Sequence, residues 1–504
     1  MNNAPVPQIY NTNDLSDTSP IEKEVPAYTK KEVILSAVTA VLAFLFVRYT
    51  VFNLTGFFTT GTFIALISAA VIYLRKKEFK FSRFNKILTA VLYIFSTVFS
   101  ITANDFIKSL DTIFLCAAAS YLIYSVTASE SDVERFLPYA LKKSLFSNPF
   151  SKFGTQGRIA ADSLKGSKIG GNILPVLIGL FITVPLTAIV AALLMSADDG
   201  LAKMLSGIAE KIFSDNISVI IAQLMLTIPC SMYIFGMLYS NCFRDDLKVL
   251  DRDECSQKIE SARFIRNLIV YTAVTPICIL YVMFFISQAN YFLSAFMNNL
   301  PDGYSYADYA RQGFFELFAV SVINLGVIAG ISLFSKNSGR NKPAALKFYT
   351  VTISIFTLVL IATAVSKMVM YISAYGLTQL RFYTTWFMLL LAVIFVMIII
   401  KQFRFDFRFA RHLSIAFTLL FGILCFSRPD SLIAAYNIEM YNAGYLSELD
   451  TQQIMRMSDD AVLTAFNKGV VSKKTAAERF SHNGNTSNLD YYNLSSVILR
   501  SKSE

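Results

Sequence analysis

Apolar and polar residues follow one another along this chain in long blocks. A run of about 18 or more apolar residues can cross a bilayer as a helix, and a helix satisfies its own backbone hydrogen bonds in lipid. The sequence therefore predicts an all-α fold, a polytopic transmembrane helical bundle of about eleven spans. The expected spans are 33–52, 57–74, 87–102, 109–126, 173–195, 217–239, 267–289, 313–334, 348–372, 383–400 and 412–427.

Basic residues are distributed unevenly among the segments between these runs. Counted on alternate sides, the segments on the side of the N-terminus hold 30 Lys and Arg, whereas the opposite loops hold 5. Cytoplasmic loops of membrane proteins carry an excess of Lys and Arg. The pattern predicts that the N-terminus is inside and that the C-terminal tail, after an odd number of spans, is outside.

The order of apolar runs and polar segments divides the chain into five parts. A basic amphipathic segment, with Phe136 and Leu141 among Arg135 and Lys142, is expected to lie on the inner leaflet; a solvated loop is the alternative. The five parts are a cytoplasmic N-terminal tail (1–32), a four-helix membrane region (33–126), the basic amphipathic cytoplasmic loop (127–172), a seven-helix core membrane domain (173–427) and a partly helical extracytoplasmic tail (428–504).

The composition of the chain indicates which partners to expect. Of 504 residues, 54% are hydrophobic and only 16% are charged, whereas soluble domains are about 25% charged. The net charge of +10 comes from short clusters beside apolar runs, so it indicates orientation in a membrane. The lipid bilayer is the expected partner and nucleic acid is not; an unidentified membrane or envelope protein partner stays open.

Residue types that carry metal or cofactor chemistry are sparse. The two histidines, His412 and His482, lie far apart in the sequence, and the six cysteines show no zinc-type spacing. No phosphate-binding loop or dinucleotide-binding glycine pattern is present. We therefore expect no metal, no cofactor and no assignable catalytic residue.

Prolines and glycines mark particular points within the spans. A proline inside a helix removes one hydrogen bond and tends to kink the helix, so kinks are expected at Pro185, Pro229 and Pro276. Gly326 and Gly330 have the four-residue spacing that lets a neighbouring helix approach closely. Such features occur in transporters with broken helices and equally in ordinary helix packing.

Ionisable and polar residues gather at the outer ends of the spans. Charges within or beside membrane helices are costly, so they are candidates for function. Lys367 and Glu316 are expected to pair, because isolated buried charges are expensive. The alternative is a set of structural ion pairs and snorkelling side chains. The candidate outer-face polar cluster consists of Asp198, Asp199, Asp308, Arg311, Glu316, Asn324, Lys367, Tyr371 and Arg381.

Several blocks of the sequence occur together in a known group of proteins. The longest is YADYARQGFFEL at 306–317, accompanied by LMSADD at 194–199, YISAYGLT at 371–378 and MSDDA at 457–461. In this order they resemble bacterial multipass membrane proteins of the domain-of-unknown-function 4173 type, related to group 4153. The resemblance implies a bacterial inner membrane and one folded domain at the outer face, and it implies no activity.

Three functions remain open from the sequence. A permease or transporter-like protein with an outward-facing polar pocket fits the number of spans, the prolines and the charged cluster. A membrane-embedded enzyme acting on envelope lipid or glycan would use two of the outer carboxylates as acid and base. A membrane scaffold or sensor of the cell envelope would use the basic loop and the tail as contact surfaces.

Overall fold

The computed structural model describes residues 28–133, 135–164, 215–243, 251–296, 306–336, 342–404, 406–481 and 493–503, together with separate positions between 179 and 204. The all-α prediction is confirmed, since the described elements are helices and one isolated β-bridge joins Ile265 to Ser335. Among the described residues, ten helices are long and apolar enough to cross a membrane. The predicted span at 173–195 lies largely outside the described residues.

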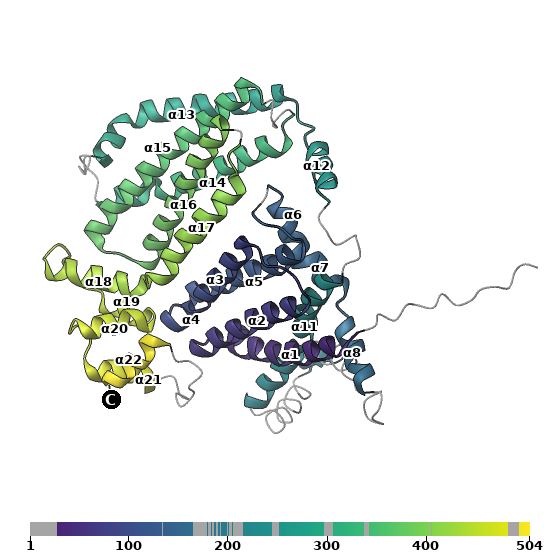
Figure 1. Cartoon of the computed structure of the whole chain (residues 1–504). Coiled ribbons are helices and arrows are strands. Elements are labelled where there is room, and N and C mark those ends of the chain that lie inside the picture. The colour runs from purple at the N-terminus through teal and green to yellow at the C-terminus, as the bar shows by residue number, and fades with distance from the viewer. Residues whose placement is uncertain are drawn as a thin grey trace, which may run out of the picture.

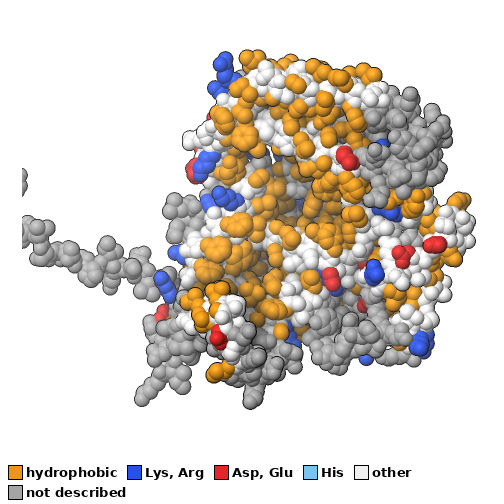
Figure 2. All heavy atoms as spheres, turned by 180° about the vertical axis from the view of Figure 1, so that it is seen from behind, with side chains coloured by type: hydrophobic (Ala, Val, Ile, Leu, Met, Phe, Trp, Pro, Cys, Tyr) orange, Lys and Arg blue, Asp and Glu red, His pale blue; other side chains and the backbone are white. Residues whose placement is uncertain are grey.

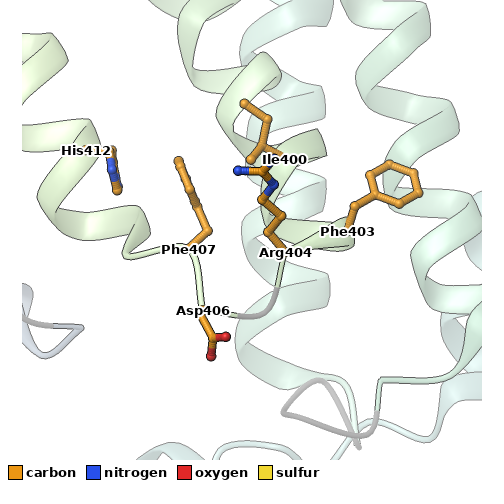
Figure 3. A pocket seen from close by; sticks show the side chains of 6 residues that line it. All are labelled: Ile400, Phe403, Arg404, Asp406, Phe407 and His412. Carbon is orange, nitrogen blue, oxygen red and sulfur yellow. The ribbon is translucent and has the colours of Figure 1, made fainter.

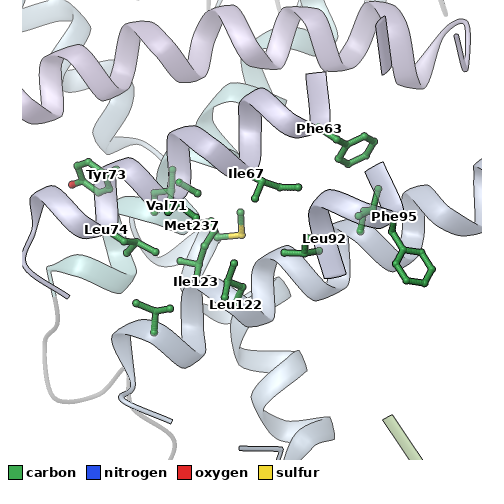
Figure 4. Packing of buried hydrophobic residues seen from close by; sticks show 14 of the residues in the cluster. Phe63, Ile67, Val71, Tyr73, Leu74, Leu92, Phe95, Leu122, Ile123 and Met237 are labelled. Carbon is green, nitrogen blue, oxygen red and sulfur yellow. The ribbon is translucent and has the colours of Figure 1, made fainter. Parts of the chain in front are cut away.

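The membrane helices form two groups, and each has its own apolar core (Figure 1). In what we call the first bundle, side chains of α2, α3, α5 and α11 meet, among them Phe63, Leu92 and Met237 (Figure 4). The first bundle comprises α1 (Lys30–Phe46), the π-helix η1 (Val47–Val51), α2 (Phe57–Lys76), α3 (Arg83–Ser96), α4 (Val98–Ile101), α5 (Asp105–Thr127) and α11 (Asp215–Cys242). The second bundle comprises α13 (Asn267–Phe296), α14 (Tyr306–Phe334), α15 (Ala344–Tyr375) and α16 (Gln379–Phe403).

Helix α17 (Phe409–Phe426) joins the two bundles. It packs beside α16, and its Phe421, Leu424 and Cys425 belong to the core of the first bundle. The ring of Phe421 stacks on Phe95 of α3 with centroids 5.8 Å apart. Helix α17 therefore contacts both bundles, and Tyr383 of α16 adds a direct contact by accepting from Asn104 of the first bundle at 2.9 Å.

The predicted cytoplasmic loop forms four short helices that pack against the first bundle. These are α6 (Leu137–Lys142), η2 (Lys143–Ser147), α7 (Asn148–Ser151) and α8 (Thr155–Leu164). Asn148 donates to the side chain of Asn241 at 2.8 Å, and Gln156 donates to Ser231 at 2.7 Å. A side chain at Gly236 would collide with the backbone of Pro149, so this glycine permits the close approach of α7 to α11.

The C-terminal tail forms a compact helical domain with a core of its own, which we call the C-terminal domain. It comprises α18 (Pro429–Asn442), α19 (Thr451–Arg456), α20 (Asp459–Asn467), α21 (Lys473–Ser481) and α22 (Leu494–Ser503). Its core includes Ile433, Ile438, Ile454, Val462 and Leu499. The predicted helical part of the tail, around Ile454 and Leu463, corresponds to α19 and α20, and most of the Asn- and Ser-rich segment lies outside the described residues.

The two ends of the molecule differ in what they carry. The C-terminal domain lies at one end of the bundles, whereas α6, α7 and α8 lie at the other, with α8 beside α1, and α12 (Arg252–Ser261) lies near the second bundle (Figure 1). The reverse view shows hydrophobic side chains over the middle of both bundles, with much of the charge toward the two ends (Figure 2). This distribution suits a protein surrounded by lipid at its middle.

Candidate functional site

The predicted outer-face cluster is only partly described by the structure. Asp198 is exposed, Asp199 lies outside the described residues, and Asp308 and Arg311 lie in the first turns of α14 with side chains that the structure does not describe. Glu316 is exposed on α14 and acts electrostatically on Lys367 of α15. The ion pair expected between Glu316 and Lys367 stays a prediction. The carboxylate pair that the enzyme hypothesis requires also stays a prediction, because Asp199 and the Asp308 side chain lie outside the described residues.

Arg381 and Tyr371 come together at the end of α15. The guanidinium of Arg381 lies over the Tyr371 ring, 3.9 Å from its centroid, and donates to the backbone carbonyls of Tyr375 and Gly376. Carbonyls at a helix end have no partner within the helix, and a cation there is favourable. Arg381 thus stabilises the end of α15, which accounts for its position without a ligand.

Asn324 is a buried hub within the second bundle. Its side-chain oxygen accepts from the Tyr281 hydroxyl of α13 at 2.6 Å, and its amide donates to Thr357 of α15 at 2.9 Å. Asn324 is 1% exposed. One amide therefore links three helices in the membrane interior, where a buried polar group without a partner would be costly.

Thr357 continues a row of buried hydroxyls along α15. Thr350, Ser354 and Thr357 are spaced four and three residues apart, so they share one face of the helix, and all three are fully buried. Just before the first residue of α15, the ammonium of Lys342 donates to Thr350 at 3.1 Å and to Gln402 at 2.7 Å. We call Lys342, Thr350, Ser354, Thr357, Asn324 and Tyr281 the polar column.

The polar column presents mainly hydrogen-bond acceptors. Each of the three α15 hydroxyls donates its proton to the carbonyl four residues earlier, at 2.7 Å. A hydroxyl oxygen that donates in this way keeps lone pairs for a second group. Thr350 uses one for Lys342 and Thr357 uses one for Asn324. Ser354, between them, is left with acceptor capacity.

Lys342 at the entry to the polar column has a lowered pKa. Burial and the nearby charge of Lys347 lower it from the ordinary 10.5 to about 8. Its hydrogen-bond partners are neutral, so no counter-ion offsets the lost hydration. The column therefore begins with an ammonium group that loses its proton at a lower pH than an ordinary lysine does.

The prolines and glycines are placed as follows. Pro229 lies inside α11 and Pro276 inside α13, whereas Pro185 lies outside the described residues; the kinks themselves stay predictions. A Cβ built at Gly326 or Gly330 meets nothing within 4 Å. The expected close approach of a neighbouring helix is therefore absent there among the described residues, because both glycines face open space.

A half-open pocket lies at the turn between α16 and α17, at the end away from the C-terminal domain. His412 stacks on Phe407 with centroids 4.4 Å apart, and its Nδ1 lies 2.8 Å from the carbonyl of Arg408. The pocket is lined by Ile400, Phe403, Arg404, Asp406, Phe407 and His412 (Figure 3). In the described part of the chain, no group of three His, Cys, Asp or Glu is placed to hold a metal ion.

Asp460 of α20 is a buried carboxylate that the sequence reading did not single out as a site. One oxygen accepts from the Thr102 hydroxyl at 2.6 Å and the Ala103 amide at 2.9 Å. The other accepts from Arg428 at 2.9 Å and from the Ser495 hydroxyl. Residues of the first bundle, of the segment after α17 and of the C-terminal domain thus meet on one side chain. The MSDDA block was its only sequence signal.

Two further contacts attach the C-terminal domain to the second bundle. Asn437 of α18 accepts from the Leu377 amide at 2.6 Å and donates to the Leu377 carbonyl at 2.8 Å. Asp430, also fully buried, accepts from Gln379 of α16 at 2.8 Å. The C-terminal domain is therefore bonded to the ends of both bundles.

Asp111 of α5 is the second buried carboxylate that the sequence reading missed. It lies within a membrane helix and is fully buried, and neither of its oxygens has a hydrogen-bond partner. The expected span at 109–126 placed it at a boundary. The structure begins α5 at Asp105, with the Asn104 side chain as the N-cap, and so moves Asp111 inward.

These features define the class of protein: an integral, multi-pass helical membrane protein with a folded C-terminal domain attached to its two bundles. The chain belongs to the family described as a domain of unknown function (DUF4153), which matches residues 87–465. The matched region contains Asp111, the polar column and Asp460. No curated protein and no solved structure matches the chain.

Proposed function

We propose that the protein is a permease that carries a small, hydrogen-bond-donating solute along the polar column of the second bundle. The observation that supports this function is the row of fully buried hydroxyls on one face of α15, with acceptor capacity left at Ser354. Ser, Thr and Asn also stabilise membrane helix packing. Packing alone, however, does not require an ammonium group at the entry.

Polar side chains line the column from Lys342 to Thr357, and apolar side chains follow on α15 toward Lys367. Beyond Thr357, the same region of α15 carries buried Leu360, Ile361 and Ala364. In this proposal these apolar side chains close the path by excluding water. The solute then enters from the Lys342 end, and Glu316 and Lys367 lie beyond the apolar segment.

Cysteine accessibility tests the column directly. With the six native cysteines replaced by alanine, Ser354→Cys and Thr357→Cys should react with a charged, membrane-impermeant thiol reagent added at the Lys342 side. Ile355→Cys is the matched control, because Ile355 is 49% exposed toward the lipid-facing surface of the same helix. Equal protection of all three thiols from both sides would contradict a water-accessible path.

The eleventh span and the orientation belong to the same proposal. The side chain of Gln156 on α8 bonds Ser36, close to the start of α1, whereas α11 contacts η1 at the far end of α1. The membrane span expected at 173–195 would carry the chain from the end of the molecule where α8 lies to the opposite end, where α11 contacts η1. We place the C-terminal tail on the outer side of a bacterial inner membrane, so a fluorescent protein fused after Glu504 should be dark. We also place the chain in the 4173-type branch of the family.

A sensor role is the second candidate, and the C-terminal domain favours it. This domain contacts the first bundle through Asp460 and the second through Asn437, so an envelope partner bound to it would shift one bundle relative to the other. Tyr445, which is 73% exposed, is a suitable position for a photo-crosslinker in cells. A discrete crosslinked envelope protein would support this role, and crosslinks to lipid alone would count against it.

A further inference from the structure

Asp111 stands apart from every other buried charge in the described part of the chain. Glu32 of α1, equally buried, is paired with Lys77 and accepts from Thr29 and Tyr73. Asp111 is buried to the same degree, yet both of its oxygens are without a hydrogen-bond partner. Neither carboxylate is accessible to solvent, and only Glu32 has hydrogen-bond partners.

The surroundings of Asp111 are apolar. Ile107 and Leu115, one turn to either side on α5, are fully buried in the core of the first bundle. Phe114 of the same helix lies against Phe421 of α17, with centroids 5.4 Å apart. Such an environment does not solvate an ionised carboxylate, and a group placed there takes up a proton instead.

The titratable groups near Asp111 do not neutralise it. Those within electrostatic reach are thiols, Cys116 on α5 and Cys425 on α17, with Cys230 of α11 beside Cys116. Lys108, one turn away on α5, directs its ammonium to the Leu54 carbonyl at 3.1 Å and to Asp105 at 3.5 Å. A metal cation would require several oxygen ligands, and the described neighbours supply none beyond Asp111 itself.

Asp105, Lys108 and Asp111 form a series of titratable groups on α5. They follow one another at three-residue intervals, so Asp111 lies about 9 Å deeper along the helix than Asp105. Asp105 has a side chain that is 78% exposed, and Lys108 is almost buried. Asp105 therefore lies at the surface, whereas Asp111 lies in the interior of the first bundle.

We infer that Asp111 is a proton-binding site within the membrane, which holds its proton at neutral pH and exchanges it with the solvent. The neutral acid leaves α5 packed against α17. Ionisation would draw water or a cation to the carboxylate and disturb that contact, and α17 would pass the disturbance to the second bundle. The inference goes beyond the proposed permease function and holds whether or not the polar column carries a solute.

Infrared difference spectroscopy of the full chain in phosphatidylethanolamine–phosphatidylglycerol vesicles tests the site. At neutral pH, a protonated-carboxyl band should be present in the wild type and absent in Asp111→Asn, and it should disappear reversibly as the pH is raised. Asp105→Asn, which removes the exposed carboxyl of the same helix, should keep the band. Asp111→Glu should restore a shifted band and so separates loss of the proton from loss of the fold.

Two results would overturn the inference. Identical spectra of the wild type and Asp111→Asn at neutral pH would show that the carboxyl is ionised. A band that persists until the protein unfolds at alkaline pH would show a proton that does not exchange. Failure here is distinguishable from failure of the permease proposal, because thiol labelling at Ser354 and Thr357 reports on the second bundle alone.

Discussion

Two regions of the molecule each contain a fully buried carboxylate: the junction around Asp460 and the interior of the first bundle around Asp111. They differ in the hydrogen-bond partners that they provide. Asp460 accepts from the side chains of Thr102, Arg428 and Ser495 and from a backbone amide. Asp111 accepts from no described group. Burial alone therefore does not identify a functional charge, and the presence or absence of hydrogen-bond partners distinguishes the two carboxylates.

The two arrangements have different energetic consequences. A buried ion pair with complete hydrogen bonding contributes little net stability, but losing one partner leaves an uncompensated charge and costs about 3–5 kcal/mol. A buried acid without partners contributes nothing to stability, so replacing it with an apolar group is neutral or stabilising. We therefore expect the fold to depend on Asp460 and not on Asp111.

The largest effect is expected from removing the cation at the junction. Arg428→Gln would leave the Asp460 carboxylate buried without its guanidinium, and we expect a loss of about 3 kcal/mol in the free energy of unfolding. Proteolysis within the C-terminal domain should increase in parallel. The measurement is denaturant unfolding in detergent micelles together with limited proteolysis.

Arg456→Gln is the matched control for this change. Arg456 is an exposed arginine of the same domain, and surface substitutions of this kind usually shift stability by about 0.5 kcal/mol or less. Equal losses in the two variants would mean that the junction does not depend on the Asp460 ion pair.

A smaller effect is expected where the C-terminal domain contacts the loop between α15 and α16. Gly376 has a φ of +74°, and a Cβ there would lie 2.8 Å from the Asn437 side-chain oxygen. Gly376→Ala should cost about 2–3 kcal/mol, since strain and collision add. Gly444→Ala, with a φ of +78° and open space around it, should cost about 1 kcal/mol.

Thermal unfolding of these two variants sharpens the comparison between the two regions. A large difference between them would show that the junction depends on several precise contacts beside Asp460. If both variants lost the same amount, the Asn437–Leu377 contact would carry no special weight.

Lys342 provides an intermediate case, with hydrogen-bond partners but no counter-ion. Its pKa is about 8 in the folded protein against 10.5 ordinarily, so between these values the unfolded chain holds a proton that the folded chain has released. Stability from this group therefore rises with pH from about 8 to 10.5. A fully buried group with this change in pKa would contribute about 3 kcal/mol. Because Lys342 is only partly buried, solvent screening reduces the shift that we expect in the stability difference between wild type and Lys342→Met to about 1 kcal/mol in favour of the wild type.

Lys347→Gln provides the control for this titration. Removing the neighbouring charge that lowers the pKa of Lys342 should move the rise in stability to higher pH. If the stability difference between the wild type and Lys342→Met stayed constant between pH 8 and 10.5, Lys342 would titrate as an exposed lysine does.

The membrane helices could be predicted from the sequence because a long apolar run has few other solutions in lipid. Their exact ends could not, because caps set them: Asn104 begins α5 and Thr378 begins α16. That shift of a few residues changed Asp111 from a boundary residue into a buried one.

The candidate site was predicted less completely. The predicted pairing of Lys367 with Glu316 stays a prediction, and Arg381 donates to helix-end carbonyls, a role that depends on where α15 ends. Asp460 lies in a polar tail that resembles a solvated segment, and its partner Thr102 is 358 residues away in the chain. Pairings at such separation have no local signal in a single sequence.

The central claim, that the two buried carboxylates have opposite roles, is tested most directly by Asp111→Leu and Asp460→Leu measured side by side in the same micelles. The free energy of unfolding should be unchanged or higher for Asp111→Leu. For Asp460→Leu it should fall by about 3 kcal/mol or more, because Arg428 and its neighbours lose their acceptor. A comparable loss in both variants would contradict the account, since it would mean that Asp111 holds the structure together as Asp460 does.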